Sequence, residues 1–296
     1  MVSYSDVYFP SAPIPDENAR LTLHARDYGA PFAGAPDVLC LHGLTRNSAD
    51  FQEIAAHLSR QYRVVVADQR GRGLSQWDPE PARYTPGVYV QDMLSLLDHL
   101  GIARTAIIGT SMGGLMAMVM GMVARDRMSA VVINDVGPDI EAAGLARIAS
   151  YTGKTQPAAT WDDAAEIAKF INAVAFPDYG PDDWMGFARK LFIEKDGVPV
   201  PAYDPAIANG LKPQSDAPVA PPDLWPMWDA LAGLPVLCVR GGLSDLLSAA
   251  TLAKMAEHHP GMIWVTVPNR GHAPMLDEPE AVEAIDSFLA TLPPTP

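Results

Sequence analysis

Cysteine is scarce in this chain of 296 residues, which contains only Cys40 and Cys238. One pair cannot staple a chain of this size. Both lie in apolar runs, VLCLHG and PVLCVRG, so we expect two buried free thiols. Cys and His do not cluster at zinc-ligand spacing, and we expect no metal and no cofactor. A chain that needs no disulfide fits the reducing cytoplasm, where we expect the protein to work.

Positive charge and long apolar runs are scarce as well. Lys and Arg number 21 against 35 Asp and Glu, a net charge of −14, which disfavours binding to a nucleic-acid backbone. No stretch approaches the roughly 20 apolar residues of a membrane span. The first residues, MVSYSDVYFPSAPIPDE, lack the basic and apolar regions of a signal peptide. The expected partner is a small molecule, neither a nucleic acid nor a membrane.

Short apolar runs alternate with stretches of helical periodicity along most of the chain. We predict strands over 21–27, 38–41, 63–67, 105–109, 131–134, 236–240 and 262–267. We predict helices over 49–58, 88–100, 113–123, 249–258 and 279–292. This alternation is typical of βαβ units, so the sequence predicts an α/β fold with a mostly parallel sheet flanked by helices.

The segment 138–229 interrupts this alternation. It shows no buried strand pattern, and it carries 14 acidic against 7 basic residues. A capping box at Thr160 and a proline at position 181 indicate two helices, and the prolines from 198 to 226 indicate a loop. We therefore predict an α-helical cap over 138–229, inserted between two parts of one core, 1–137 and 230–296.

Four of the six tryptophans lie in this predicted cap. Aromatic side chains that line a concave site bury apolar substrate surface. We therefore place Trp161 and Trp184 as candidate pocket residues and expect a preference for medium or aromatic apolar substrates. The alternative is that both are core residues that pack the cap onto the sheet domain.

The segment Gly109-Thr110-Ser111-Met112-Gly113 fits G-x-S-x-G, and it stands between a predicted strand and a predicted helix. A serine at such a sharp turn is held with its hydroxyl above the sheet, and glycines allow the neighbouring chain to approach. The helix that follows directs its positive end toward a developing oxyanion. We predict that Ser111 is a nucleophile.

A serine nucleophile needs a base, and His272 is our candidate. It lies in NRGHAPMLDEP, a loop between a predicted strand and the last helix, from which it can reach over the sheet. The rival is His42, which enters a glycine turn and is expected to order that loop. The other five histidines are expected at the surface: His24, His57, His99, His258 and His259.

The base needs an orienting carboxylate and the oxyanion needs donors. We favour Asp245, after the strand PVLCVRG, and keep Asp135, after the strand VVIN, as the alternative. The order Ser111, Asp245, His272 is nucleophile, acid, base. We expect the oxyanion donors to be the backbone N–H groups of Met112 and Leu44.

Six segments in this order resemble the α/β-hydrolase superfamily: LHGLTRNSADF, DQRGRGLS, GTSMGG, INDVGP, VRGGLSD and NRGHAPMLDEP. They look like its branch with an HG-type oxyanion loop and a helical cap. That resemblance implies an eight-stranded sheet and a structural role for DQRGRGLS, in which Arg70 pairs internally. Related epoxide hydrolases and haloalkane dehalogenases carry aspartate as nucleophile, so Ser111 argues against both.

The resemblance leaves carboxylesterases, lactonases, carbon–carbon bond hydrolases and perhydrolases. We predict a serine hydrolase that cleaves carboxylic esters or lactones of apolar substrates through an acyl-enzyme. One alternative is a carbon–carbon hydrolase of ring-cleavage products. An acidic cap argues against its anionic substrates, although a buried Arg147 or Arg189 would reverse that locally. A second alternative is a non-catalytic binding protein on the same fold.

Overall fold

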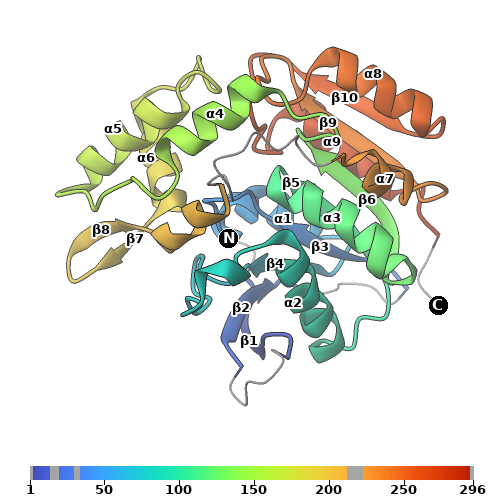
Figure 1. Cartoon of the computed structure of the whole chain (residues 1–296), viewed down its shortest axis with the longest axis horizontal. Helices are drawn as coiled ribbons and strands as arrows, with labels where there is room; N and C mark the ends of the chain where they lie inside the picture. The colour runs from blue at the N-terminus through green and yellow to red at the C-terminus, as the bar shows by residue number, and fades with distance from the viewer. Residues whose placement is uncertain (1–2, 14–19, 30–33, 212–222, 294–296) are drawn as a thin grey trace.

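The computed structural model describes residues 3–13, 20–29, 34–211 and 223–293. Eight strands form one sheet in the order β1-β2-β4-β3-β5-β6-β9-β10 (Figure 1). β1 and β2 are antiparallel to their neighbours and the other pairs are parallel, which confirms the predicted α/β class. The strands are β1 (Ser5–Pro10), β2 (Thr22–Asp27), β3 (Asp37–Leu41), β4 (Val64–Asp68), β5 (Thr105–Thr110), β6 (Met128–Asn134), β9 (Val236–Gly241) and β10 (Ile263–Val267). Of these, β1 had not been predicted.

Helices cover both faces of the sheet (Figure 1). One face packs against α2 (Pro86–His99), α3 (Met112–Val123), α7 (Trp225–Asp229) and α8 (Ala249–His258). The other packs against α1 (Gln52–Leu58) and α9 (Pro279–Leu289). Burial on both faces explains why the central strands are continuous apolar runs, as in VVVAD of β4.

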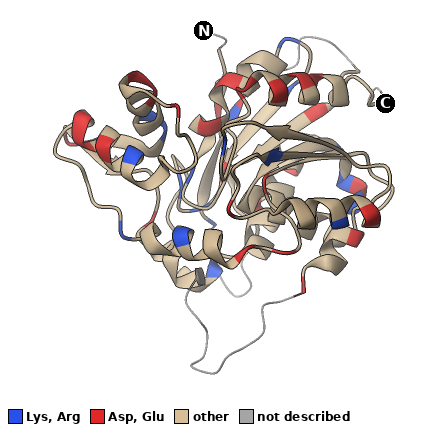
Figure 2. Cartoon of the chain, turned by 90° about the horizontal axis from the view of Figure 1, so that it is seen from above, with Lys and Arg blue, Asp and Glu red and all other residues tan. Residues whose placement is uncertain are grey.

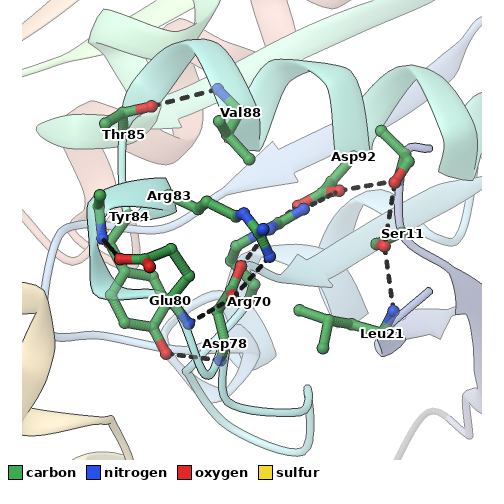
Figure 3. Close-up of polar contacts among 12 residues, drawn as sticks. Ser11, Leu21, Arg70, Asp78, Glu80, Arg83, Tyr84, Thr85, Val88 and Asp92 are labelled. Carbon is green, nitrogen blue, oxygen red and sulfur yellow. Dashed lines mark hydrogen bonds and ion pairs between the residues drawn. The ribbon is translucent and has the colours of Figure 1, made fainter. Parts of the chain in front are cut away.

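A buried ion-pair network closes the turn after β4 (Figure 3). The Arg70 guanidinium donates two bonds of 2.7 Å to Asp92 of α2 and another to Asp78. All three side chains are at most 1% exposed. The expected internal pairing of Arg70 is confirmed, and it ties the turn to α2.

The insert between β6 and β9 lies to one side of the sheet (Figure 1). It contains α4 (Ala142–Tyr151), α5 (Trp161–Asn172), α6 (Pro181–Leu191), β7 (Phe192–Lys195) and β8 (Val198–Pro201). It has its own apolar cluster, to which α5 and α6 contribute. The last part of the predicted cap belongs elsewhere, because Trp228 of α7 is fully buried against the sheet domain.

The hairpin β7–β8 corrects the expectation of a strand-free cap. Its strands are four residues long, and each has only one buried residue, so they leave no buried apolar run in the sequence. The turn between them is Asp196-Gly197, both with positive φ, a dipeptide typical of tight hairpins. That dipeptide was the signal available in the sequence.

Both cysteines are free and buried, as expected. Cys40 is on β3 and Cys238 on β9, and β5 and β6 separate these strands.

Within the described ranges, no helix has the length and apolar character needed to cross a membrane. Acidic residues are spread over the outer helices and the insert (Figure 2).

Candidate active site

Ser111 stands between the end of β5 and the start of α3 with φ 53° and ψ −114°, a strained conformation for a residue other than glycine. Glycines make the turn possible. A Cβ at Gly113 would lie 2.0 Å from the Leu41 carbonyl oxygen, and one at Gly109 would lie 2.4 Å from that of Gly113. The turn therefore presses against β3 and holds the Ser111 hydroxyl at the carboxyl edge of the sheet.

His272 connects Ser111 to a carboxylate. Its Nε2 is 2.8 Å from Ser111 Oγ, and its Nδ1 is 2.9 Å from Asp135 Oδ2. An ionised carboxylate can only accept, so Nδ1 carries the hydrogen and Nε2 is free to accept the serine proton. Asp135 is 0% exposed and the His272 side chain 7%. The structure thus brings together the predicted nucleophile and base, and the imidazole and its carboxylate are largely buried.

Asp135 is held by three further bonds. Its Oδ1 accepts from Gly241 N at 2.8 Å, its Oδ2 accepts from Ser244 Oγ at 2.7 Å, and its own N–H bonds Val239 O. Gly241 and Val239 belong to β9, the neighbour of β6, so two adjacent strands fix this carboxylate. Sequence reasoning missed Ser244, and its position directly before the candidate Asp245 was the available signal.

Asp245 was wrong as the carboxylate that orients His272. Its side chain forms a two-bond ion pair with Arg147 of α4, at 2.6 and 2.7 Å. The hydrogen bond from Arg147 is the main reason why the pKa of Asp245 lies below its ordinary value. The alternative, Asp135, follows β6, which pairs directly with the serine strand β5, whereas β9 is one strand further away. The cation that pairs with Asp245, Arg147, belongs to the insert.

The two residues predicted as oxyanion donors both lie near Ser111. Met112 begins α3, so its N–H is one of the groups left without a helical partner. Leu44 lines the cavity above Ser111. A Cβ at Gly43 would lie 3.7 Å from Ser111 Cβ, so the chain at 43–44 passes beside Ser111.

His42 orders this loop, as expected for the rival histidine. It is fully buried, and its Nδ1 donates to Gly43 O at 2.7 Å while its Nε2 accepts from Gln69 N at 3.1 Å. Burial lowers its pKa to about 4, so it is neutral near pH 7. Gly43 O and Leu44 N–H belong to one trans peptide and point in opposite directions. The bond from His42 therefore orients the Leu44 N–H.

The expectation that His24 lies at the surface is wrong. It is 0% exposed, with Nδ1 2.7 Å from Asp68 and Nε2 2.8 Å from Asp6. Burial opposes its charge, but the hydrogen bonds with both carboxylates raise the pKa of His24 above its ordinary value. It joins β1, β2 and the end of β4 and lies outside the site.

A cavity opens above Ser111 between the sheet domain and the insert. Its apolar lining includes Leu44, Phe51, Ile148, Ile171, Phe176 and Met275. Its charged lining includes Arg46, whose guanidinium bonds Asp50 at 2.7 and 2.8 Å and lies 4.3 Å from the Phe187 ring centroid. The cavity thus offers an apolar wall with one charged corner, and the sequence analysis missed Arg46.

Neither predicted tryptophan lines this cavity. Trp184 is buried in the insert's own cluster, with ring centroids 5.2 Å from Tyr179 and 5.8 Å from Phe187. Trp161 lies 3.7 Å from the Arg189 guanidinium and donates to Glu194. Their placement as pocket residues is wrong, because both stabilise the insert itself.

The insert touches both loops of the site. The N–H of Gly271, next to His272, donates to Ala175 O at 2.8 Å. On the other side, Asn47 Nδ2 donates to Lys190 O at 2.7 Å, close to the Leu44 loop. Within the part of the chain that the structure describes, no cluster of three His, Cys, Asp or Glu side chains could hold a metal ion.

Comparison with known proteins extends these observations. The model of the alpha/beta hydrolase family matches residues 38–285. A 3-hydroxybutyrate-oligomer hydrolase of Cupriavidus necator is 32% identical over 275 residues, 91% of this chain and 92% of the relative. A 2-(acetamidomethylene)succinate hydrolase of Mesorhizobium japonicum is 30% identical over 91% of this chain and 92% of its own. The crystal structure of a Novosphingobium aromaticivorans protein is 40% identical, covers 98% of this chain and 99% of its own, and superposes with TM-score 0.88.

Proposed function

Since this chain belongs to the alpha/beta hydrolase family, we propose that it cleaves carboxylic esters or lactones through an acyl-enzyme on Ser111. The observation that carries the proposal is the unbroken relay from Ser111 Oγ through His272 to Asp135, with distances of 2.8 and 2.9 Å. A protein that only binds a ligand has no need of this relay.

The relay accounts for each proton in the reaction. Ser111 Oγ attacks the ester carbonyl carbon while His272 Nε2 takes its proton, and Asp135 stabilises the imidazolium. The Leu44 and Met112 N–H groups stabilise the tetrahedral oxyanion. His272 then protonates the leaving alcohol. Water attacks the acyl-enzyme, giving one proton to His272, which returns it to Ser111 as the acid leaves.

The cavity supports an apolar substrate. Its lining is largely aliphatic and aromatic, and it includes Ser111 and Leu44. A relative named for 3-hydroxybutyrate oligomers supports the same class, because such oligomers are esters of a four-carbon hydroxy acid. We therefore propose aliphatic esters or lactones, with a 3-hydroxybutyrate dimer as the first natural-type probe.

A panel of p-nitrophenyl esters of rising chain length, simple lactones, the dimer and a dienolate tests this proposal by kcat/KM. A fluorophosphonate followed by mass spectrometry identifies the nucleophile. We expect labelling at Ser111 and higher kcat/KM for esters than for the dienolate. Labelling without any turnover would favour a binding protein, and preferential cleavage of the dienolate would favour a carbon–carbon hydrolase.

A second candidate is hydrolysis of a carboxylate-bearing enamide, as the name of the Mesorhizobium relative suggests for that protein. The observation in its favour is Arg46, which lines the cavity and whose stem lies beside Gly43. Asp50 neutralises much of this charge, which favours the neutral ester. Arg46→Gln separates the two, because it would raise KM for a carboxylate-bearing substrate and leave KM for a neutral ester unchanged.

A further inference from the structure

Arg72 is a buried arginine with no counter-ion among the described residues. It is 0% exposed and lies in the turn after β4. Its Nε donates to Leu44 O at 2.9 Å, and its Nη1 donates to Arg70 O and to Tyr89 Oη, both at 2.8 Å. Its Nη2 faces Met112 Sδ at 3.8 Å. Across 3–13, 20–29, 34–211 and 223–293, no carboxylate lies within ion-pairing distance of Arg72.

Arg70, two residues earlier, is a buried guanidinium whose charge is balanced in the ordinary way, by ion pairs. It is equally buried, and two carboxylates, Asp78 and Asp92, compensate its charge (Figure 3). A buried charge without such a partner is costly to fold. The turn therefore carries one guanidinium that serves the fold and one whose charge the fold leaves uncompensated.

The contacts of Arg72 show where that charge acts. Leu44 and Met112 are the two residues proposed to donate their N–H groups to the oxyanion, and Arg72 contacts both, through Leu44 O and Met112 Sδ. His42 holds the Gly43 carbonyl and Arg72 holds the Leu44 carbonyl, so the two peptides that flank Leu44 are each fixed by a buried side chain.

Arg72 is held by its backbone and by its side chain. Its backbone pairs with Tyr203, a cavity residue, in an antiparallel bridge, and its guanidinium lies 4.8 and 5.5 Å from the ring centroids of Tyr89 and Tyr84. A rigid donor behind a loop costs no reorganisation when charge develops on the substrate.

We propose that Arg72 is a positioning residue of the oxyanion hole: it fixes the 44–45 peptide, next to the one that carries the Leu44 N–H, through Nε, and it places a positive charge without an ion-pair partner behind both proposed oxyanion donors. This rests on the proposed function, since it assumes an anionic tetrahedral intermediate at Ser111. Arg72 does not touch the substrate, and its effect passes through Leu44 and Met112.

The test compares Arg72→Met, Arg72→Lys and, as the matched control from the same turn, Arg70→Lys. End-point fluorophosphonate labelling counts the competent sites. Because kcat is expressed per labelled site, a loss of folded protein does not change its value. The inhibition constant of a trifluoromethyl ketone, which forms a tetrahedral oxyanion on serine, reports the oxyanion hole directly.

We expect Arg72→Met to lower kcat per site about 10–100-fold, less than the loss of a direct oxyanion donor, with KM changed less than about threefold. The inhibition constant of the ketone should rise by the same factor as kcat/KM falls. Arg72→Lys keeps the charge and loses the Nε bond, so it should fall between wild type and Arg72→Met. Arg70→Lys should lower the melting temperature and leave kcat per site within about twofold.

Two results would overturn the proposal. One is a kcat per site for Arg72→Met within twofold of wild type. The other is a fall in kcat with no change in ketone inhibition. If Arg72→Met yields no folded protein, Arg72→Lys against Arg70→Lys decides by the same two criteria. Failure of the proposed function is recognised separately, because wild type would then show no ester turnover, with or without labelling at Ser111.

Discussion

The carboxylate behind His272 offers the sharpest test of the site. In Asp135→Asn, the amide must place its oxygen toward Gly241 N–H, the donor 2.8 Å from Oδ1. Its NH2 group then replaces Oδ2 and faces His272 Nδ1 at about the native 2.9 Å. An NH2 group can only donate, so Nδ1 must accept and the ring hydrogen moves to Nε2. His272 in that tautomer cannot take the Ser111 proton.

The loss expected from the wrong tautomer is on the order of 10⁴ in kcat, as for the equivalent change in a serine protease. Asp245→Asn removes only the charge opposite Arg147 and should leave kcat within about threefold, because Asp245 makes no bond to His272. Steady-state kcat per fluorophosphonate-titrated site on the best ester measures both. A variant Asp135→Asn that keeps more than a tenth of wild-type kcat, or a larger loss in Asp245→Asn, would refute the assignment.

Three further changes test other parts of the structure. Ser111→Ala should lower kcat roughly 10⁴-fold or more while the melting temperature stays near that of wild type, and retention of ester turnover would exclude Ser111 as nucleophile. Trp184→Ala should cost about 3–5 kcal/mol in urea unfolding and leave the preference between long and short esters unchanged, with Trp161→Ala as the partly buried control; a change in that preference would restore Trp184 to the pocket. The raised pKa of His24 means that its protonated form stabilises the fold, fully below about pH 6.5 and progressively less as pH rises through the raised value. The gap in unfolding free energy between wild type and His24→Gln should therefore narrow from pH 6 to pH 9, and a constant gap would contradict the buried imidazolium.

The sheet and two members of the relay could be predicted because their signals are local. Apolar runs that alternate with helical stretches indicate a mostly parallel sheet, and only a few strand orders are compatible with such connections. Ser111 follows one such run and His272 follows another, and the structure brings their side chains within 2.8 Å. Each of these residues is placed by the strand that precedes it.

The carboxylate could not be chosen in that way. Asp135 and Asp245 both follow strands, and their side chains are directed by partners far away in sequence. Asp135 bonds Gly241, 106 residues on, and Asp245 bonds Arg147, 98 residues back. His24 was misplaced for the same reason, since one of its two carboxylates, Asp68, is 44 residues away. Non-local pairing of charges decides these positions, and no local pattern records it.

The hydrogen bond from Gly271 to Ala175 limits where segments of this protein can be exchanged with those of its relatives in a chimaera. A Cβ at Gly271 would lie 2.7 Å from Ala175 Cα, so the insert and the segment before His272 are in contact without a side chain between them. A foreign insert spliced at the ends of 138–229 would bring its own backbone to this point. Any bulkier or displaced segment there would push on 270–272 and move the imidazole as well as reshape the cavity. The chain around 174–176 and the loop 270–272 therefore form one crossover block in a chimaera, although about a hundred residues separate them in the gene.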